Sequence, residues 1–433
     1  MRRILLLLIC IQSLGIFGLY GQELTLSPYS RFALGDILSG ATTRNAGMGG
    51  IGIASDNYFS VNSINPASYG DMYFTTLDFG GFWQASQLET PNTKGLQKTA
   101  GFQNVAFAFP SNDNFVLTAG FSPYSAVGYN VTTLNPIQIS DSSFIEQTEY
   151  TSSGGLNKVF FGGAVRLLNN RLRLGANFQY SFGNTRYEWV KQVFEPDTSI
   201  RVPAFRTIQI IEDAFLSGWL TQIGAIYVDT LNAENYTMIR LGAVVDYNLN
   251  LGGDRFTAFT NGVVQDSSNA LEVGSAEIPT KIGVGVMLTQ LSKWSLGIEG
   301  SFQNWENFRY FSDETQLGRE IRFAMGGEYT PNFQSLKYFK RVNYRAGAYW
   351  RQTYINVGGE PVQDFGFTVG LGIPAGLKGN RPSQGRSVSK FNISAELGRR
   401  GSLDGNQQLS ELYARIRFGV NLNDRWFVRR VVD

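Results

Sequence analysis

The sequence predicts an all-β protein: a transmembrane antiparallel β-barrel of about fourteen strands, with an N-terminal hatch that fills its lumen. Three observations predict it. Apolar and polar residues alternate with a period of two along most of the chain. Several alternating runs reach the length of about 9–11 residues that a tilted strand needs to cross a membrane. Charged residues are only 17% of the sequence, whereas soluble domains carry about 25%.

The period of two is clearest in three long runs. In Leu412–Leu422, apolar residues alternate with polar residues and glycine, and Phe365–Ile373 and Leu172–Phe182 repeat the pattern. A soluble β-sandwich also alternates, but its strands usually have about 5–6 residues. The longer runs therefore favour a membrane barrel over a sandwich.

We expect an even number of strands, which brings the C-terminus back to the periplasmic side of an outer-membrane barrel. The expected strands start near Met72, Gly101, Asn114, Asn157, Arg171, Arg206, Tyr236, Pro279, Lys293, Glu320, Arg341, Val362, Val388 and Leu412. The connections alternate in length: Ser111–Asn114 and Asn169–Asn170 are tight turns, whereas 84–101 and 132–156 are predicted as long polar loops. Tryptophans near the strand ends fit an aromatic girdle at the membrane surface. These are Trp83, Trp189, Trp219, Trp294, Trp305, Trp350 and Trp426.

Residues 1–21 form a predicted secretory signal peptide, because Arg2 and Arg3 precede an apolar run that is too short and too interrupted for a membrane helix. We place the cleavage site after Gly21. Cys10 could indicate a lipoprotein signal, but Ile9 precedes it where a small residue is required. The chain then divides into a hatch, residues 22–71, and a barrel, residues 72–433.

Composition excludes most kinds of active site. The sequence has no histidine, and its one cysteine lies in the signal peptide. Catalysis by Ser–His or Cys–His pairs and zinc sites that contain histidine are therefore excluded. Glu212 and Asp213 are an obvious acidic pair, but neighbouring residues on a strand point to opposite faces. We expect no enzyme, no cofactor and no metal site.

The charge balance argues against a nucleic-acid partner. Removal of residues 1–21 takes away two of the 37 basic residues and none of the 35 acidic ones, so the remaining chain is neutral. Proteins that bind nucleic acid usually carry a basic excess.

The run Gly47–Gly52 has the GxGxxG spacing of a dinucleotide-binding turn, and Asp71 follows at about the distance expected for a ribose ligand. However, residues 41–46 are not an apolar strand, and Pro66 would interrupt the helix that the turn requires. A barrel of about fourteen strands leaves a hole, and residues 22–71 lack strand periodicity. We therefore interpret Gly47, Met48, Gly49 and Gly50 as part of a hatch that packs closely against the wall.

Four arginines are predicted to face the lumen: Arg171, Arg173, Arg415 and Arg417. They could pair with the hatch carboxylates of Asp36, Asp56 or Asp71. Equally, they could pair only with neighbouring carboxylates of the wall and with water.

The N-terminal residues carry a family resemblance. Leu26–Phe32, the run from Gly47, and Asn65-Pro66-Ala67 resemble the start of a Bacteroidota branch of the FadL-type family of outer-membrane transporters for long-chain fatty acids and other hydrophobic compounds. The resemblance implies a fourteen-stranded barrel whose hatch carries Asn65, Pro66 and Ala67. It also implies an outer-membrane location, contact with outer-membrane lipid, and a hydrophobic small molecule as ligand.

In that family the ligand leaves the barrel through a gap in the wall, which a kink in the third strand creates. Here the predicted third strand, Phe115–Val131, contains Pro123, and proline cannot donate a ladder hydrogen bond. Alternatively, and with equal weight, Pro123 simply marks the end of the membrane-crossing part of this strand. The candidate lateral gate comprises Phe121, Ser122, Pro123, Tyr124, Ser125 and Gly128.

The alternative function is a non-transporting barrel that serves as a subunit of an outer-membrane protein secretion or assembly complex. Basic residues in predicted periplasmic turns and in the tail could dock an acidic partner, such as another outer-membrane protein or a lipoprotein. They could also face anionic phospholipid headgroups. This periplasmic basic rim comprises Lys337, Lys340, Arg341, Lys378, Arg381, Arg386, Arg425, Arg429 and Arg430.

Overall fold

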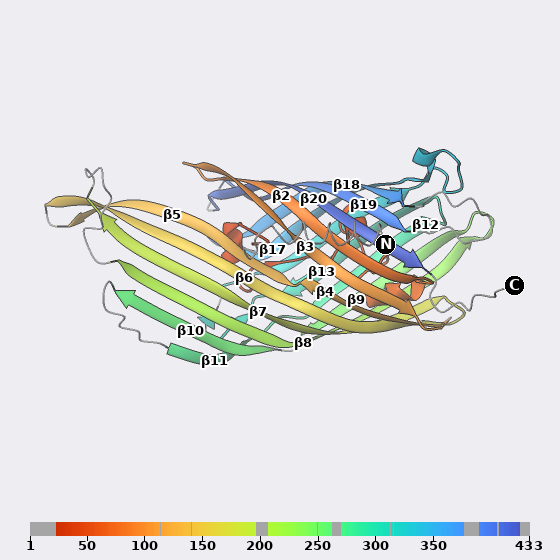
Figure 1. Ribbon diagram of the computed structural model, residues 1–433, viewed down its shortest axis with the longest axis horizontal. Helices are drawn as coiled ribbons and strands as arrows, with labels where there is room; N and C mark the ends of the chain where they lie inside the picture. Colours follow the sequence, from red (N-terminus) through yellow and green to blue (C-terminus); the bar gives the residue numbers. More distant parts are fainter. Residues whose placement is uncertain are drawn as a thin grey trace, which may run out of the picture.

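The fold is a long antiparallel β-barrel (Figure 1). A computed structural model describes residues 23–112, 114–139, 141–195, 207–248, 250–261, 270–311, 313–314, 316–375, 389–404 and 407–424. The predicted signal peptide, Trp426 and most of the basic rim lie outside these residues.

Fourteen strands pair in a ring, and β20 pairs with β2 along Thr75–Glu89 to close it. The predicted strand count is confirmed, and each predicted start lies within or close to a different strand. In ring order the strands are β2 (Thr75–Glu89), β3 (Lys94–Pro110), β4 (Phe115–Pro123), β6 (Ser142–Leu167), β7 (Leu172–Phe194), β8 (Ile208–Asn232), β9 (Thr237–Asn248), β12 (Lys281–Gln290), β13 (Trp294–Asn304), β16 (Arg319–Tyr329), β17 (Asn343–Val357), β18 (Glu360–Pro374), β19 (Lys390–Ser402) and β20 (Leu409–Asp424).

The two ends of the barrel differ. At one end, here called the turn end, short connections such as 168–171 and 291–293 reverse the chain. The opposite end is called the loop end. The prediction of long polar loops over 84–101 and 132–156 is wrong, because these residues form the β2–β3 and β5–β6 hairpins. Their Thr and Tyr side chains still favour strand pairing beyond the apolar part of the wall.

The outer face of the barrel is apolar, and the inner face is polar. On β18, Phe367 and Val369 are exposed, whereas Thr368 between them is buried. On β7, Leu174 and Phe178 point outward and Asn177 points inward. A soluble sandwich would bury the apolar set instead, so the observed inversion is the one that a barrel in lipid requires.

A sheet continues beyond the barrel at the loop end, on the left of Figure 1. It combines the halves of β6, β7 and β8 nearest the loop end with β5 (Ser125–Ile139), β10 (Leu251–Asn261) and β11 (Ala270–Ala276). The short strands β14 (Arg309–Tyr310) and β15 (Asp313–Glu314) border it. Strand structure is thus interrupted twice near the loop end, once between β4 and β5 and once between β9 and β10.

Residues 23–74, here called the N-terminal segment, lie among the inner faces of the strands (Figure 1). The segment contains η1 (Pro28–Arg31), β1 (Asp36–Ile37), α2 (Thr43–Ala46) and η2 (Pro66–Asp71). A Cβ atom on Gly175 of β7 would approach Pro66 to 2.3 Å, and one on Gly326 of β16 would approach Met48 to 2.3 Å. Because β7 and β16 lie on different sides of the ring, the barrel encloses the segment.

An apolar core lies inside the barrel toward the loop end. Trp305 is fully buried there and stacks on Tyr354, with ring centroids 4.6 Å apart. Tyr29 and Leu34 of the N-terminal segment belong to the same core. The assignment of Trp305 to an aromatic girdle is therefore wrong, because the chain folds inward after β13 and carries this ring away from the outer face.

Candidate functional site: the lumen and the break in its wall

Arginine–carboxylate clusters fix the N-terminal segment to the wall. At the turn end, Asp71 of η2 lies between two inward-facing arginines, and all three side chains are buried. Arg173 of β7 lies 2.7 Å from Asp71 Oδ1, and Arg240 of β9 donates to Oδ2. Arg240 also donates to the carbonyl oxygens of Ala54 and Ser55. Two cations around one buried carboxylate compensate its desolvation.

A second cluster joins α2 to β16 and β17. Arg44 of α2 lies 3.0 Å from Asp56 and 3.3 Å from Glu328. The guanidinium of Arg345 donates to the same Glu328 carboxylate at 2.6 Å. The segment and the wall thus share one ion network.

The glycine run surrounds a carboxylate of the wall. The amides of Gly52 and Ile53 donate to Glu299 of β13 at 2.7 and 2.9 Å. Gly49 and Arg322 complete the contact, since Arg322 donates to the Gly49 carbonyl at 2.6 Å and to Glu299 at 2.8 Å. Gly49 has a φ of 70°, which favours glycine. The run therefore holds an anion with backbone amides, but the anion is a side chain of this protein.

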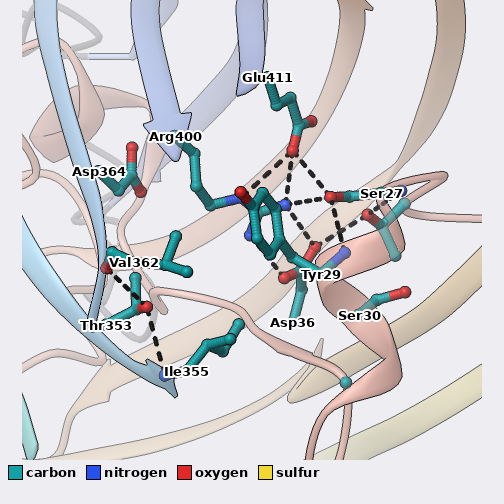
Figure 2. A network of polar contacts seen from close by, with 12 residues as sticks. Ser27, Tyr29, Ser30, Asp36, Thr353, Ile355, Val362, Asp364, Arg400 and Glu411 are labelled. Carbon is teal, nitrogen blue, oxygen red and sulfur yellow. Dashed lines mark hydrogen bonds and ion pairs between the residues drawn. The ribbon is translucent and has the colours of Figure 1, made fainter. Parts of the chain in front are cut away.

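A third cluster pins the first residues of the segment near the loop end (Figure 2). Arg400 of β19 donates to Asp36 at 2.7 Å and to Glu411 at 2.7 Å, and its guanidinium lies 4.9 Å from the ring centroid of Tyr29. Ser27 donates to Glu411 at 2.7 Å. Burial alone raises the pKa of the Asp36 carboxyl, but the Arg400 guanidinium and the Thr25 hydroxyl hold that pKa below its usual value.

The Asn65-Pro66-Ala67 motif packs against glycines of β7 and β8. Asn65 accepts a hydrogen bond from the Ala67 amide at 3.0 Å, which begins η2. Its amide nitrogen donates to the Ile53 carbonyl at 2.7 Å. A Cβ on Gly224 would lie only 1.8 Å from Asn65 Oδ1. The motif needs a flat inner wall at this place.

The four arginines predicted to face the lumen have different surroundings. Arg173 pairs with Asp71 of the segment, whereas Arg417 pairs with Glu396 of the wall. Arg415 donates to Gln84 of β2 at 2.6 Å. The prediction for Arg171 is wrong: this residue lies in the turn before β7, exposed, 3.7 Å from Asp229. Side chains alternate between the two faces only within a strand, so counting by twos does not predict the direction of a side chain in a turn.

The candidate gate coincides with a break in the third strand of the ring. β4 ends at Pro123, Tyr124 belongs to no strand, and β5 begins at Ser125. Opposite, Gly154 and Gly155 of β6 have φ values of 109° and 137°, so β6 bends at the same level. Across this break the pairing with β6 continues with its register shifted by one residue, and the Tyr124 amide donates to the Leu156 carbonyl at 2.7 Å.

Between the break and the loop end, β3 and β5 run apart (Figure 1). β3 pairs with β4 only over Val105–Pro110, and among the described residues no strand pairs with that edge of β3 over 94–104. The N-terminal segment occupies part of the interval. β1 pairs with Ser125–Ala126 of β5, Leu24 contacts Gly101 of β3, and the Thr25 carbonyl abuts Gly128.

A cavity of about 190 Å³ lies in the lumen beside this break. On one side its lining is apolar and includes Leu24, Phe82, Phe102, Pro123 and Phe160. The opposite lining comes from β16–β20 and is rich in charged and tyrosine side chains. The cavity therefore offers an apolar wall next to the break and a polar wall across from it.

The described part of the basic rim lies on the connection from β16 to β17, which contains η3 (Tyr338–Arg341). Lys337 and Lys340 are exposed there, beside Leu336 and Phe339, which are 95% and 77% exposed. The other six predicted rim residues lie outside the described part of the chain.

Comparison with known proteins identifies the family. The family model BamG matches residues 1–433. The chain belongs to the BamG family. No curated protein matches this BamG-family chain. None of the helices in its described part has the length and apolar character needed to span a membrane.

Solved structures share its fold. The toluene transporter TbuX of Ralstonia pickettii has a TM-score of 0.58 and 14% identity, over 89% of this chain and 99% of that chain. The toluene transporter TodX of Pseudomonas putida has a TM-score of 0.56 and 14% identity, over 90% and 99%. A FadL homologue of Pseudomonas aeruginosa has a TM-score of 0.56 and 11% identity, over 88% and 98%. The resemblance to FadL-type channels therefore holds for the fold, while the family is BamG.

Proposed function

We propose that this BamG-family barrel is an outer-membrane channel for hydrophobic small molecules, with the N-terminal segment as its hatch. The ligand enters the lumen from the loop end and leaves sideways between β3 and β5. One observation carries the proposal: on the edge of β3 that faces β5, strand pairing ends where Val105 meets Phe121 of β4. Among the described residues no strand pairs with that edge over 94–104, so the wall is not continuous between β3 and β5. The apolar lining of the cavity lies beside this break.

The outer face supports a location within a lipid bilayer. Large apolar side chains such as Phe178, Phe323 and Phe367 are 58–70% exposed on different strands. In water this face would cost about 25 cal/mol for each Å² that lipid can cover. The predicted signal peptide and the fold shared with TbuX, TodX and the FadL homologue agree with the outer membrane.

Opening of the path requires movement of β1. This strand pairs Ile37 with Ser125 on the edge of β5, and Leu38 donates to the Tyr124 carbonyl at 3.0 Å. Facing residues of an antiparallel pair have Cα atoms about 4.5–5.5 Å apart, which suits a disulfide. The only native cysteine is Cys10, in the predicted signal peptide, so an engineered pair has no competitor.

The test is uptake of radiolabelled toluene and of a radiolabelled long-chain fatty acid by cells that carry Ile37→Cys/Ser125→Cys. We expect oxidation to reduce uptake of at least one ligand about tenfold or more, and reduction to restore it. Gln87→Cys/Leu412→Cys joins β2 to β20 away from the break and serves as the control. Replacement of Pro123 by valine tests the break itself, since valine can donate a ladder hydrogen bond, and strand pairing with β3 that continued past Phe121 would narrow the gap. Unchanged uptake in the locked protein and in the valine variant would reject the lateral path.

A second candidate function is that of a subunit in an outer-membrane protein secretion or assembly complex. The match to the BamG family favours this candidate. The exposed Leu336 and Phe339, with Lys337 and Lys340 beside them, offer a surface at the turn end on which a protein could dock.

Purification in a mild detergent tests the second candidate. A subunit brings a stoichiometric partner with it, and Leu336→Ser/Phe339→Ser removes that partner while the barrel itself stays folded. A barrel that purifies alone in its native membrane background, with or without these substitutions, contradicts the subunit role.

A further inference from the structure

Four charged side chains in the lumen stand apart from the ion networks of the N-terminal segment. They are Lys158 of β6, Asp246 of β9, Lys281 of β12 and Glu320 of β16. Among the described residues, none of the four has an ion-pair partner within 4.0 Å. Glu320 is only 7% exposed, and Asp246 Oδ1 is buried without a hydrogen-bond donor.

Strand register places three of them in one row across the inner wall. Asp246 faces Lys281, Lys281 faces Gln303 of β13, and Gln303 faces Glu320 in the next strand. Gln303 does not bridge its neighbours, because its amide donates to the Pro279 carbonyl at 2.7 Å. Adjacent strands lie about 4.8 Å apart, so the Cα atoms of Lys281 and Glu320 are separated by about 10 Å.

The row faces the cavity and the break in the wall. Lys281 and Glu320 both line the cavity, together with Ser122 and Pro123 of the candidate gate. Lys158 pairs in register with Ser122 and places its ammonium 5.7 Å from the ring centroid of Tyr124. Opposite charges are thus held at a fixed spacing, next to the apolar lining.

Glu320 is buried and Lys281 is half-buried, and a charge that is withdrawn from water without a partner costs free energy. A ligand of opposite charge would offset that cost. A ligand headgroup with an anion and an ammonium a few Å apart matches the two signs: the anion faces Lys281 and the ammonium faces Glu320. The apolar lining at Phe82, Phe102 and Phe160 suits the tail of the same molecule. A neutral hydrocarbon would leave both charges unmatched.

We propose that the cavity binds a zwitterionic amphiphile, with its headgroup between Lys281 and Glu320 and its apolar tail toward the break between β3 and β5. This inference rests on the proposed channel function and specifies its ligand class. Recognition of the head is by charge-assisted hydrogen bonds, which are stronger than neutral ones. Asp246 and Lys158 set the local field, and Gln303 keeps Lys281 and Glu320 apart.

The test uses the full-length mature barrel in a mild detergent and native mass spectrometry. Lysophosphatidylethanolamine is compared with a monoacylglycerol that has the same acyl chain and no charge. We expect the zwitterion to bind about tenfold tighter or more. Lys281→Met and Glu320→Gln should each bring its affinity close to that of the monoacylglycerol and leave monoacylglycerol binding unchanged. Lys293→Met and Glu234→Gln, which make the same changes at exposed turn positions, should have no effect.

Three results would overturn the inference. Equal binding of the two lipids, with no effect of either substitution, would mean that water alone solvates the row. Binding of lysophosphatidic acid as tight as that of the zwitterion, with Glu320→Gln silent, would reduce the site to an anion site. Failure to bind either lipid while toluene uptake persists would reject the zwitterion and leave the proposed channel intact.

Discussion

Two regions of the same lumen treat buried charge in opposite ways. Around the N-terminal segment, Asp71 has two arginines within ion-pair distance, and the Glu299 carboxylate receives two amides and a guanidinium. Beside the cavity, Lys281 and Glu320 have no ion pair among the described residues. Both regions sit on the inner faces of neighbouring strands, so strand alternation alone does not separate them. Ion pairs are formed where the N-terminal segment packs against the wall, whereas the charges without ion pairs lie where we propose that a ligand binds.

The largest expected effect is loss of a paired charge. Arg240→Met removes one of the two cations from fully buried Asp71 and leaves two carbonyl oxygens without their donor. Breaking a buried pair costs about 3–5 kcal/mol. Hydrogen exchange of residues 54–72 should therefore accelerate about a hundredfold or more. Arg171→Met, at an exposed pair in the turn, is the control and should change little. Equal effects of the two variants would contradict the structural role of the Asp71 cluster.

Close packing of the segment gives the next largest effect. Gly224→Ala places a Cβ 1.8 Å from Asn65 Oδ1, so the motif must shift, at a cost of about 1–3 kcal/mol. Gly252→Ala, on β10, meets nothing within 4 Å and is the matched control. Thermal unfolding in detergent measures both. A tolerated Gly224→Ala would show that η2 does not press on the wall as described.

Acid should loosen the Arg400 cluster by a smaller amount. The folded-state pKa of Asp36 is held below its ordinary value of 3.8, so its contribution is complete above that pH and is lost as the pH falls through the lowered pKa. Protection factors for residues 25–37, corrected for intrinsic exchange at each pH, should drop in this acid range. In Asp36→Asn they should already be low at neutral pH, and the acid step should disappear. Persistence of the step in that variant would assign it to another group.

The smallest effect is expected in the unpaired row. Without a lipid added, Glu320→Gln removes a buried charge that has no ion pair, so stability should change by less than about 0.5 kcal/mol or rise. Thermal unfolding beside Arg240→Met gives the direct contrast. A loss as large as that of Arg240→Met would mean that Glu320 is structural, and the distinction between the two regions would fail.

Parity along the strands predicts which side chains face inward, and it could have located more of the lumen than it did. Arg240 precedes inward-facing Gly242 by two positions, and Arg400 has the parity of Glu396. Counting by twos from those residues would have added both arginines to the set that is predicted to face the lumen. Parity does not say which carboxylate each arginine meets, because Arg400 and Asp36 are separated by 364 positions in the chain.

A period of two is a local property of the chain, so the barrel, its fourteen strands and its apolar outer face could be predicted from the sequence alone. The sequence also predicted an interruption at Pro123, either a kink or the end of the membrane-crossing part of the strand, since proline cannot donate to the ladder. Three outcomes became visible only in the folded chain: the glycine run holds Glu299, Trp305 turns into the core, and Lys281 and Glu320 have no ion pair within the part of the chain that the structure describes. These outcomes depend on contacts between residues that are far apart in the chain, and a register slip of one residue would move a strand side chain to the opposite face.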